Sequence, residues 1–403
     1  MSKKVIVFTG GGTGGHIFPI ISIVRGLKKI APNEFEYYYL GPEDPPELIA
    51  PLELEGIKVK FIKTGKIRRY FNIGDIVSNV VDLVFYVPIG ILQAFGFVFS
   101  KYPDLVFCKG GYGSLPTALS AFLLRTPIFL HESDLEPGLA NKIISKFSLL
   151  IFTSFQETSY FNPKKTIFVG NPVRKEMFDM KLEQAIDILN ITGEKKVVAF
   201  LGGSQGARFI NEMILNAIKD FIDNFEIIHQ TGKYNYKQVS AEALASLVPE
   251  KRKYYHPFPV LTERQLAATY KIADIIVSRG GAGAIFEIAA SGKPSIIIPF
   301  PFAAKHHQEQ NAFYYQKKGA CIVLEQEVAT PHFFLEKIKS ILNNPTLYEK
   351  MSKAAKEFAT IDAGDKIARY IVSYLKPEIL QQKEKESRKE EKIEKLIKQN
   401  YES

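Results

Sequence analysis

Glycine-rich turns that follow short apolar runs are the features of this 403-residue sequence best suited to bind phosphate. The first, Thr9–Pro19, reads TGGGTGGHIFP and follows the run KVIVF. The spacing Gly10-x-Gly12-x-x-Gly15 matches the fingerprint of dinucleotide-binding loops, in which a strand ends in a turn at the start of a helix. Unpaired amides and the helix dipole attract phosphate there. Because His16 follows the glycines directly, it is a candidate general base.

The first loop lacks the partner that a nicotinamide dinucleotide requires. In that class of site an acidic residue at the end of the second strand binds the ribose. The corresponding run EFEYYYLG ends at Gly41, and the first acidic residue after it is Glu43. We therefore expect the loop to bind the phosphate group of another ligand.

Two later segments repeat the pattern of an apolar run followed by glycines. They are VVAFLGGSQGA at 197–207 and SRGGAGA at 278–284. A single turn of this kind is a weak signal, but three predict a cleft whose two walls both bind phosphate.

Polar residues after the third turn suit a sugar ligand. Glu287 lies about two helical turns beyond Arg279, where a carboxylate could bind a ribose diol. Gln308 and Asn311 are three residues apart on a predicted helix, so they share a face and could contact sugar hydroxyls. The alternative is a salt-bridged glutamate with solvated surface amides.

The segment LHESDLEPGLANK places four polar residues after an apolar run: His131, Glu132, Asp134 and Asn141. Their spacing does not match a metal site, and the sequence contains no Asp-x-Asp pair that could carry a nucleotide-bound metal. We expect a loop that lines the cleft, no metal site and no required cofactor, although stimulation by a divalent metal is compatible with this interpretation.

Thirteen short apolar runs, separated by helical patterns, must position these residues. The first seven cover 4–10, 34–41, 58–65, 104–110, 127–132, 149–155 and 166–172, and the last six cover 196–203, 225–232, 253–258, 273–281, 294–301 and 319–325. Such a series is typical of buried parallel strands with crossover helices. The sequence therefore predicts an α/β protein with two Rossmann-like, doubly wound domains.

The predicted domains are 1–170 and 171–355, with the hinge near GNPVRKE at 170–176. A helix at 356–376 could pack back on the first domain. The segment 377–403 is almost wholly charged and polar, which indicates a solvated helix or frayed tail without chemistry of its own.

Composition limits the possible partners and locations. The formal charge of +9 suggests an anionic partner, but no nucleic-acid motif is present, so we expect no nucleic-acid binding. Cys108 and Cys321 are far apart, as expected for buried thiols of a reducing compartment. The chain enters a predicted strand at once, so we expect no signal peptide and a cytoplasmic location.

The apolar segment 80–100 has three possible interpretations. Residues 83–99 carry no charge, but Pro88, Gly90, Gln93 and Gly96 interrupt the run. Basic residues interleaved with aromatics precede it: Lys58, Lys60, Lys63, Lys66, Arg68 and Arg69. We favour a helix at the surface of an anionic membrane over a buried crossover helix or a membrane span.

Taken in order, the motifs resemble glycosyltransferase family 28. The matching segments are GGGTGGHIFP at 10–19, GGYGSLP at 110–116, HESDLEPGLANK at 131–142, GNPVR at 170–174, GGSQGARFIN at 202–211, RGGAGAIFEIAASGKPSIIIP at 279–299 and HHQEQNA at 306–312. The resemblance covers about residues 4–375. It implies a GT-B fold, in which two Rossmann-like domains face a cleft.

The resemblance also implies roles for individual residues. In the first domain Thr13, Gly14 and Gly15 would face the diphosphate of a lipid acceptor, His16 would be the base, and Tyr112 and Asn141 would contact the acceptor. In the second, UDP-GlcNAc would be bound by Arg174, Ser204, Gln205, Gly206, Ala282, Glu287, His307, Gln308 and Asn311, with the uracil near Val260–Leu261. Two departures concern Ser133-Asp134, where the family often has Gln-Asn, and Ala282–Ala284, which lacks the usual hydroxyl residue.

The implied reaction is an inverting transfer of GlcNAc from UDP-GlcNAc to the C4 hydroxyl of undecaprenyl-diphosphate-MurNAc-pentapeptide. The enzyme would act as a peripheral protein on the anionic cytoplasmic face of the cell membrane. The alternatives are a diacylglycerol glycosyltransferase, a UDP-GlcNAc 2-epimerase, or a noncatalytic subunit that binds a UDP-sugar.

Overall fold

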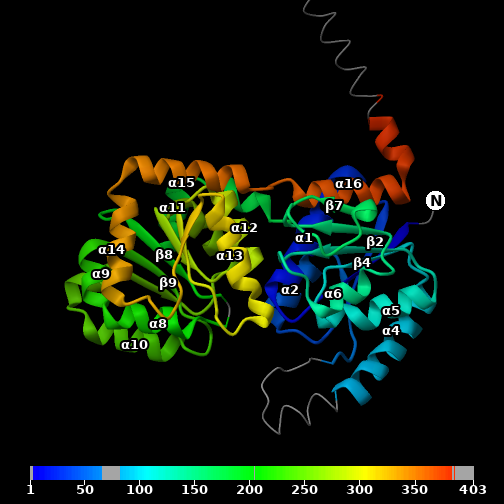
Figure 1. The fold of residues 1–403 in the computed structure, drawn as a ribbon, viewed down its shortest axis with the longest axis horizontal. Helices are drawn as coiled ribbons and strands as arrows, with labels where there is room; N and C mark the ends of the chain where they lie inside the picture. Colours follow the sequence, from blue (N-terminus) through cyan, green and yellow to red (C-terminus); the bar gives the residue numbers. More distant parts are fainter. Residues whose placement is uncertain (1–2, 66–81, 204, 384, 386–403) are drawn as a thin grey trace, which may run out of the picture.

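Two wholly parallel sheets form the framework of the computed structural model, which describes residues 3–65, 82–203, 205–383 and 385 (Figure 1). Within these residues the first sheet has the strand order β3-β2-β1-β4-β5-β6-β7 and the second β10-β9-β8-β11-β12-β13. The strand order reverses beside β1 and beside β8, as in doubly wound folds. Each strand lies inside one of the thirteen predicted apolar runs, so the prediction of two Rossmann-like domains is confirmed.

The first sheet is covered by helices on both faces. Its strands are β1 (Lys4–Thr9), β2 (Phe35–Gly41), β3 (Lys58–Phe61), β4 (Leu105–Cys108), β5 (Ile128–Glu132), β6 (Leu150–Thr153) and β7 (Thr166–Phe168). The helices are α1 (Gly14–Ile30), α2 (Pro46–Leu54), α4 (Val87–Lys101), α5 (Leu115–Leu123), α6 (Leu139–Ile144) and α16 (Ala363–Leu375). One core contains residues of α1, α2 and α16, and the core on the opposite face contains residues of α4, α5 and α6.

The second sheet has the same layered arrangement. Its strands are β8 (Val197–Leu201), β9 (Glu226–Gln230), β10 (Tyr255–Phe258), β11 (Ile275–Ser278), β12 (Ser295–Ile297) and β13 (Cys321–Val323). The helices are α7 (Leu182–Leu189), α8 (Arg208–Asn216), α9 (Ile218–Asn224), α10 (Tyr236–Ser246), α11 (Glu263–Ile272), α12 (Ala282–Ser291), α13 (His307–Lys317), α14 (Pro331–Leu342) and α15 (Pro345–Phe358). Both cysteines are buried and free, as predicted.

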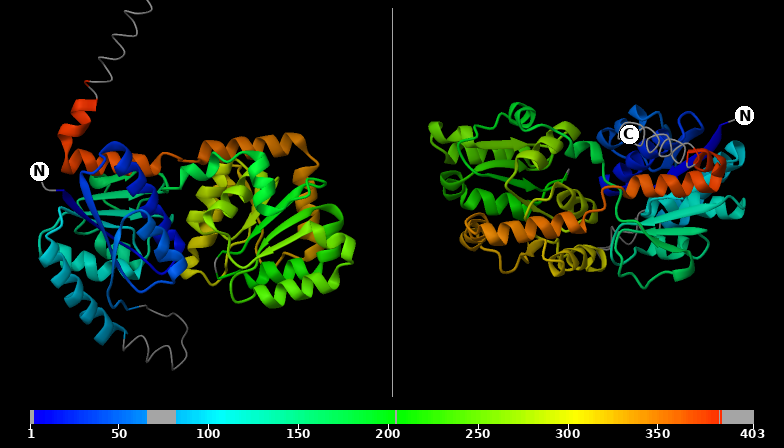
Figure 2. Two further views of the ribbon diagram at one scale, coloured as in Figure 1. Left: turned by 180° about the vertical axis from the view of Figure 1, so that it is seen from behind. Right: turned by 90° about the horizontal axis from the view of Figure 1, so that it is seen from above.

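The chain passes between the two domains twice, and the two connections touch. Gly170 in the first connection has φ of +89°, and a Cβ atom there would lie 1.7 Å from Oγ1 of Thr360 in the second. After the second connection α16 packs on α1, and its Ile367 and Ile371 lie in the core of the first sheet (Figure 2). Ile379 and Leu380 also pack against that core, so the first residues beyond α16 are not wholly solvated.

Helix α4 packs along one narrow stripe only. Its buried residues Gly90, Ala94 and Val98 recur every four positions, on the side that contacts α5. Among the described residues, one stretch, Val84–Lys101, is long and apolar enough to cross a membrane, and 17% of it is buried in the protein. The alternative of a buried crossover helix is therefore wrong for α4, because most of its apolar side chains are exposed.

Candidate active site

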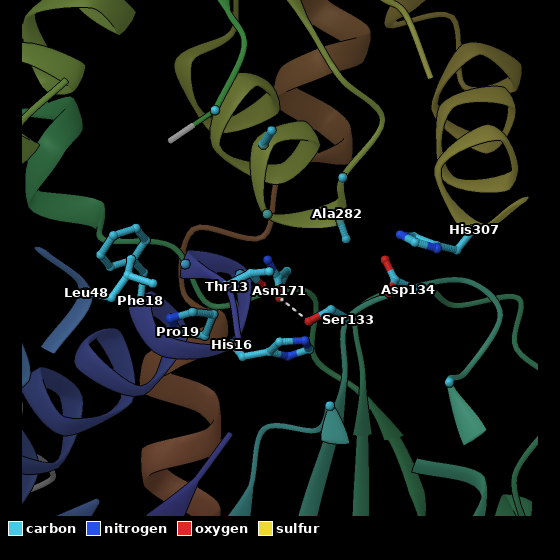
Figure 3. Close-up of a pocket in the computed structure, with 18 of the residues that line it drawn as sticks. Thr13, His16, Phe18, Pro19, Leu48, Ser133, Asp134, Asn171, Ala282 and His307 are labelled. Carbon is cyan, nitrogen blue, oxygen red and sulfur yellow. Dashed lines mark hydrogen bonds between the residues drawn. The ribbon is translucent and has the colours of Figure 1, made fainter. Parts of the chain in front are cut away.

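The carboxyl ends of both sheets face a cleft of about 1940 Å³ between the domains (Figure 3). Loops that follow parallel strands gather at one edge of a sheet, so residues distant in sequence meet there. Thr13–His16 line the wall formed by the first domain. Gly203 and Gly281–Ala284 line the opposite wall.

The first glycine loop is partly occupied by a carboxylate of the protein itself. The amide of Gly12 donates to Oδ1 of Asp44 at 2.9 Å, and Asp44 lies in the loop after β2. This carboxyl is 8% exposed, and burial raises its pKa. Thr13, Gly14 and Gly15, at the start of α1, line the cleft beyond this contact.

His16 lies in the first turn of α1, is half-buried and lines the cleft. Burial, followed by the positive charge of Lys109, lowers the pKa of its imidazole to about 4. Within the described part of the chain its Nδ1 atom has no hydrogen-bond partner. The imidazole is therefore neutral at pH 7.

Tyr112 packs against the first glycine loop, and Asn141 packs against the glycines that follow β4. A Cβ atom on Gly12 would lie 2.9 Å from Cε1 of Tyr112, and one on Gly110 would lie 2.5 Å from Nδ2 of Asn141. Both residues line the cleft, and Asn141, which is 4% exposed, donates from Nδ2 to Oε2 of Glu132 at 2.7 Å. The structure thus brings both predicted acceptor residues into the same cleft as His16, with the Asn141 amide already bonded to a carboxylate.

Glu132 organises the loop after β5. Its Oε1 atom accepts the amide of Asp134 at 2.9 Å, while its backbone ends the buried strand. Burial, and then the negative charge of Asp134, raise the pKa of Glu132. The neighbouring His131 ring contacts the carbonyl oxygen of Gly170 at 3.0 Å, which ties this loop to the first connection between the domains.

On the opposite wall Arg174 and Glu287 form a partly buried ion pair. Nη2 of Arg174 donates to Oε1 of Glu287 at 3.0 Å, and the hydroxyl of Tyr270 donates to Oε2 at 2.9 Å. Nη1 of Arg174 donates to Glu263 at 3.1 Å, and the guanidinium lies 4.1 Å from the centre of the Phe18 ring. Glu287 is therefore salt-bridged, as the alternative interpretation expected. It also lines the cleft, so its position remains compatible with binding a ligand.

The predicted residues of α13 lie in two different environments, the open cleft and the contact between the domains. His307 and Gln308 line the cleft, and Oε1 of Gln308 accepts the amide of Phe300 at 3.0 Å. Asn311 is fully buried, and its amide bridges the domains by donating to Asp134 at 2.9 Å and accepting from Leu135 at 3.0 Å. The shared helix is confirmed, but the structure places the Asn311 side chain in an interdomain contact rather than toward the open cleft.

The remaining residues predicted to bind the donor lie on or beside two glycine turns. Ala282 begins α12 and lines the cleft, as do Val260 and Leu261. Ser204 lies outside the described residues. Gln205 is exposed and Gly206 packs against Thr231, so within the described part of this turn Gly203 is the residue that lines the cleft.

Sequence reasoning missed two charged residues, Asp44 and Lys109. Asp44 lies 32 positions beyond Gly12 along the chain, and no local pattern connects them. Lys109 directly follows the buried strand LVFC and precedes two glycines, which is a signal that could have identified it. Across the described residues no group of three His, Cys, Asp or Glu side chains is arranged to hold a metal ion.

Comparison with known proteins gives a consistent family assignment. The N-terminal domain of glycosyltransferase family 28 matches residues 6–153, and its C-terminal domain matches 197–367. A UDP-N-acetylglucosamine–N-acetylmuramyl-(pentapeptide) pyrophosphoryl-undecaprenol N-acetylglucosamine transferase from Borrelia hermsii is 36% identical over 92% of this chain and 97% of its own. The chain belongs to glycosyltransferase family 28. A relative of the same name from Treponema denticola is 33% identical over 93% of this chain and 97% of its own.

Solved structures of differently named enzymes share the fold of this chain. The crystal structure of Acinetobacter baumannii MurG matches with a TM-score of 0.67 at 24% identity, over 92% of this chain and 99% of that one. A UDP-GlcNAc 2-epimerase from Neisseria meningitidis matches with a TM-score of 0.63 at 16% identity, over 92% of this chain and 100% of that one. The GT-B arrangement is therefore shared by this family 28 member and by enzymes of other activities.

Proposed function

We propose that this enzyme transfers GlcNAc from UDP-GlcNAc to the C4 hydroxyl of MurNAc in undecaprenyl-diphosphate-MurNAc-pentapeptide. The observation that carries the proposal is identity of 33–36% over nearly the whole length of transferases with that name. A cleft with glycine turns on both walls suits two diphosphate-bearing substrates. The epimerases share the fold at much lower identity, which favours transfer over epimerisation.

In the proposed reaction His16 accepts the proton of the acceptor hydroxyl. The hydroxyl oxygen attacks the anomeric carbon of GlcNAc from the face opposite UDP, a new C–O bond forms, and the bond to the β-phosphate oxygen breaks. UDP leaves with that electron pair, so the configuration at the anomeric carbon inverts. The lowered pKa keeps His16 unprotonated at pH 7, as a base must be before it acts.

The donor half of the cleft is assigned to the second domain. Glu287 would bind the ribose while remaining paired with Arg174, because each carboxylate oxygen can accept more than one hydrogen bond. The amides at the start of α12 would stabilise the negative charge that develops on UDP. His307 and Gln308 would contact GlcNAc, and Asn311 would act indirectly by holding the Asp134 loop against the second domain.

The acceptor half is assigned to the first domain. Thr13, Gly14 and Gly15 would bind the lipid diphosphate at the N-terminus of α1, where partial positive charge favours anions. Tyr112 lines the same region. Asn141 would help through Glu132, since its amide donates to that carboxylate.

The experiment combines labelled UDP-GlcNAc with undecaprenyl-diphosphate-MurNAc-pentapeptide and measures lipid-linked disaccharide. We expect His16→Ala to lower kcat by about 100-fold or more while UDP affinity is unchanged. His332→Ala, in the exposed first turn of α14, is the matched control and should behave as wild type. Disaccharide formation by His16→Ala at the wild-type rate would remove the base assignment, and UDP binding without any disaccharide would support a noncatalytic subunit.

We also propose that α4 docks the enzyme on an anionic membrane surface. Eight apolar or aromatic side chains in and beside α4 are well exposed: Val84, Phe85, Tyr86, Ile89, Leu92, Phe95, Phe99 and Tyr102. Lys63 and Lys101 lie at its two ends, with Lys63 near the Tyr86 ring. Lys66, Arg68 and Arg69 of the predicted basic segment lie outside the described residues. An apolar face bordered by lysines suits the headgroup region, and the buried stripe against α5 favours a surface helix over a span.

A further inference from the structure

His229 is a fully buried histidine of the second domain, and the reaction proposed above gives it no task. It lies near the end of β9 and is 0% exposed. Its Nδ1 atom is 2.9 Å from the hydroxyl oxygen of Tyr255, and its Nε2 atom is 2.9 Å from Oδ1 of Asn211 on α8. Asn211 ends the GGSQGARFIN segment and has no task in the reaction either.

The hydrogen bonds of this cluster run in one direction. Nδ2 of Asn211 donates to the carbonyl oxygen of Thr231 at 3.0 Å, so Oδ1 of the same amide faces His229 as an acceptor. A neutral imidazole carries one proton, which then lies on Nε2, and Nδ1 accepts from the Tyr255 hydroxyl. The chain of donors therefore starts at Tyr255 and ends at the backbone of Thr231, in the loop after β9.

The backbone of Thr231 supports the glycines of the second turn, Gly202, Gly203 and Gly206. β8 and β9 are neighbours in the sheet, so the loops that follow them lie together (Figure 1). A Cβ atom on Gly206 would lie 2.2 Å from the carbonyl oxygen of Thr231, and one on Gly232 would lie 2.4 Å from Cα of Gly206. This contact leaves no room for a methyl group on either side, so a shift of the Thr231 carbonyl also shifts Gly206.

The position of these glycines matters for phosphate binding. Gly203 lines the cleft, and α8 begins at Arg208, just beyond Gly206. Backbone amides at such a turn bind a phosphate only where they converge on it, because each hydrogen bond depends on distance and angle. The proposed donor, UDP-GlcNAc, brings a diphosphate to this wall of the cleft.

Stability does not require a polar chain here. When both partners of a buried hydrogen bond are replaced by apolar groups of the same shape, stability is often almost unchanged. Apolar groups cannot, however, donate to the Thr231 carbonyl from the side of α8. We propose that His229 and Asn211 are positioning residues, which act through Thr231 to keep the second glycine turn in the conformation that binds the donor diphosphate. The inference rests on the proposed function and adds residues to its donor site.

The test compares UDP with uridine, which shares the base and the ribose but has no phosphate. Binding to the full chain is measured by isothermal titration calorimetry for UDP and by ligand-observed NMR for uridine. We expect His229→Leu to raise the Kd of UDP about 10-fold, as for the loss of one hydrogen bond to a charged group, and to leave the Kd of uridine unchanged. Asn211→Leu cuts the chain at Thr231 itself and should have the same effect, so it replaces His229→Leu if that variant does not fold.

Two further variants separate positioning from general destabilisation. His229→Gln keeps an N–H group that can donate to Asn211 and should bind UDP as wild type does. His256→Leu is the matched control, because His256 on β10 contacts Oε1 of Glu226 at 2.8 Å, at the end of β9 away from the cleft. It should lower the free energy of unfolding in urea and leave both Kd values unchanged.

The disaccharide assay gives a second readout. KM for UDP-GlcNAc should rise in His229→Leu and Asn211→Leu. KM for the lipid-linked acceptor should stay at the wild-type value, because the acceptor is assigned to the other wall of the cleft.

An unchanged Kd of UDP in both leucine variants, or an equal loss of affinity for UDP and uridine, would overturn the inference while wild-type binding of UDP leaves the proposed donor in place. UDP affinity that falls as much in His256→Leu would also overturn it. UDP binding needs no acceptor, so the result stays decisive if the wild-type protein makes no disaccharide. A wild-type protein that does not bind UDP would overturn the proposed donor and the inference together.

Discussion

The exposed face of α4 allows a quantitative test of membrane docking. Leu92 and Phe99 are 72% and 66% exposed, so most of each side chain is available to leave water. Full burial of a Leu or Phe side chain is worth about 1.5–3 kcal/mol, which scales to about 1–2 kcal/mol each at these exposures. The double variant Leu92→Ser/Phe99→Ser should lose about 2–4 kcal/mol of partitioning free energy. At 1.4 kcal/mol per factor of ten, the smaller value predicts about 30-fold weaker binding.

Co-sedimentation with vesicles that contain anionic phospholipid measures this difference at low and moderate salt. The matched control is Val328→Ser/Tyr234→Ser, which removes two side chains that are 64% and 86% exposed on the second domain. We expect the control to bind as wild type does. Higher salt should weaken binding of all three proteins through the lysines near α4, because screening reduces attraction to anionic lipid.

Activity in detergent separates docking from chemistry. With a short-chain, water-soluble acceptor the Leu92→Ser/Phe99→Ser enzyme should turn over at the wild-type rate, because the face of α4 does not enter the reaction. Equal vesicle binding by the α4 variant and the control variant would refute the assignment of this face to the membrane.

Three further predictions address the donor site, the connections and acid stability. Glu287→Gln removes the charge expected to bind ribose and should weaken UDP-GlcNAc binding about 10-fold or more in calorimetry; an unchanged Kd would contradict that role. Gly170→Ala should lower the free energy of unfolding by at least about 2 kcal/mol in urea, because its Cβ would overlap Thr360 at a positive φ, and Thr360→Ala should restore part of the loss. Burial lowers the pKa of His229 to about 3 in the folded state, below its unfolded value of 6.5, so its contribution is fully present above pH 6.5 and is lost as the pH falls toward 3. His229→Gln should flatten the fall of unfolding free energy by about 1.4 kcal/mol per pH unit in that window, and parallel slopes would exclude the effect.

The strands and glycine turns could be predicted because their signals are local. A short β-branched run such as VIVF is buried on both faces in any doubly wound sheet, and a glycine turn must follow it if a helix starts at once. Val7 pairs with Tyr38 on one side and Val106 on the other, as its position in a central strand requires. Local pattern therefore fixed where Thr13–His16 lie relative to the sheet.

Contacts between the walls of the cleft could not be predicted in the same way. Arg174 and Glu287 are 113 positions apart, and Asn311 and Asp134 are 177 apart. Periodicity predicts that each residue lies at a strand end or on a helix, but it carries no information about which partner lies opposite. Asn311 is an example. Its place on a helix was predicted, but the contact of its side-chain amide with the first domain was not.

The first glycine loop shows how one unpredicted residue changes the chemistry expected of a motif. From its spacing, every amide from Gly10 to Gly15 could bind phosphate, as in a nucleotide loop. Asp44 already accepts the Gly12 amide, so that part of the loop bears a negative charge that opposes an anion. We therefore expect a diphosphate to bind at Thr13–Gly15, which line the cleft at the N-terminus of α1. Asp44, which sequence reasoning missed, thus changes which amides of this loop we expect to bind the acceptor phosphate.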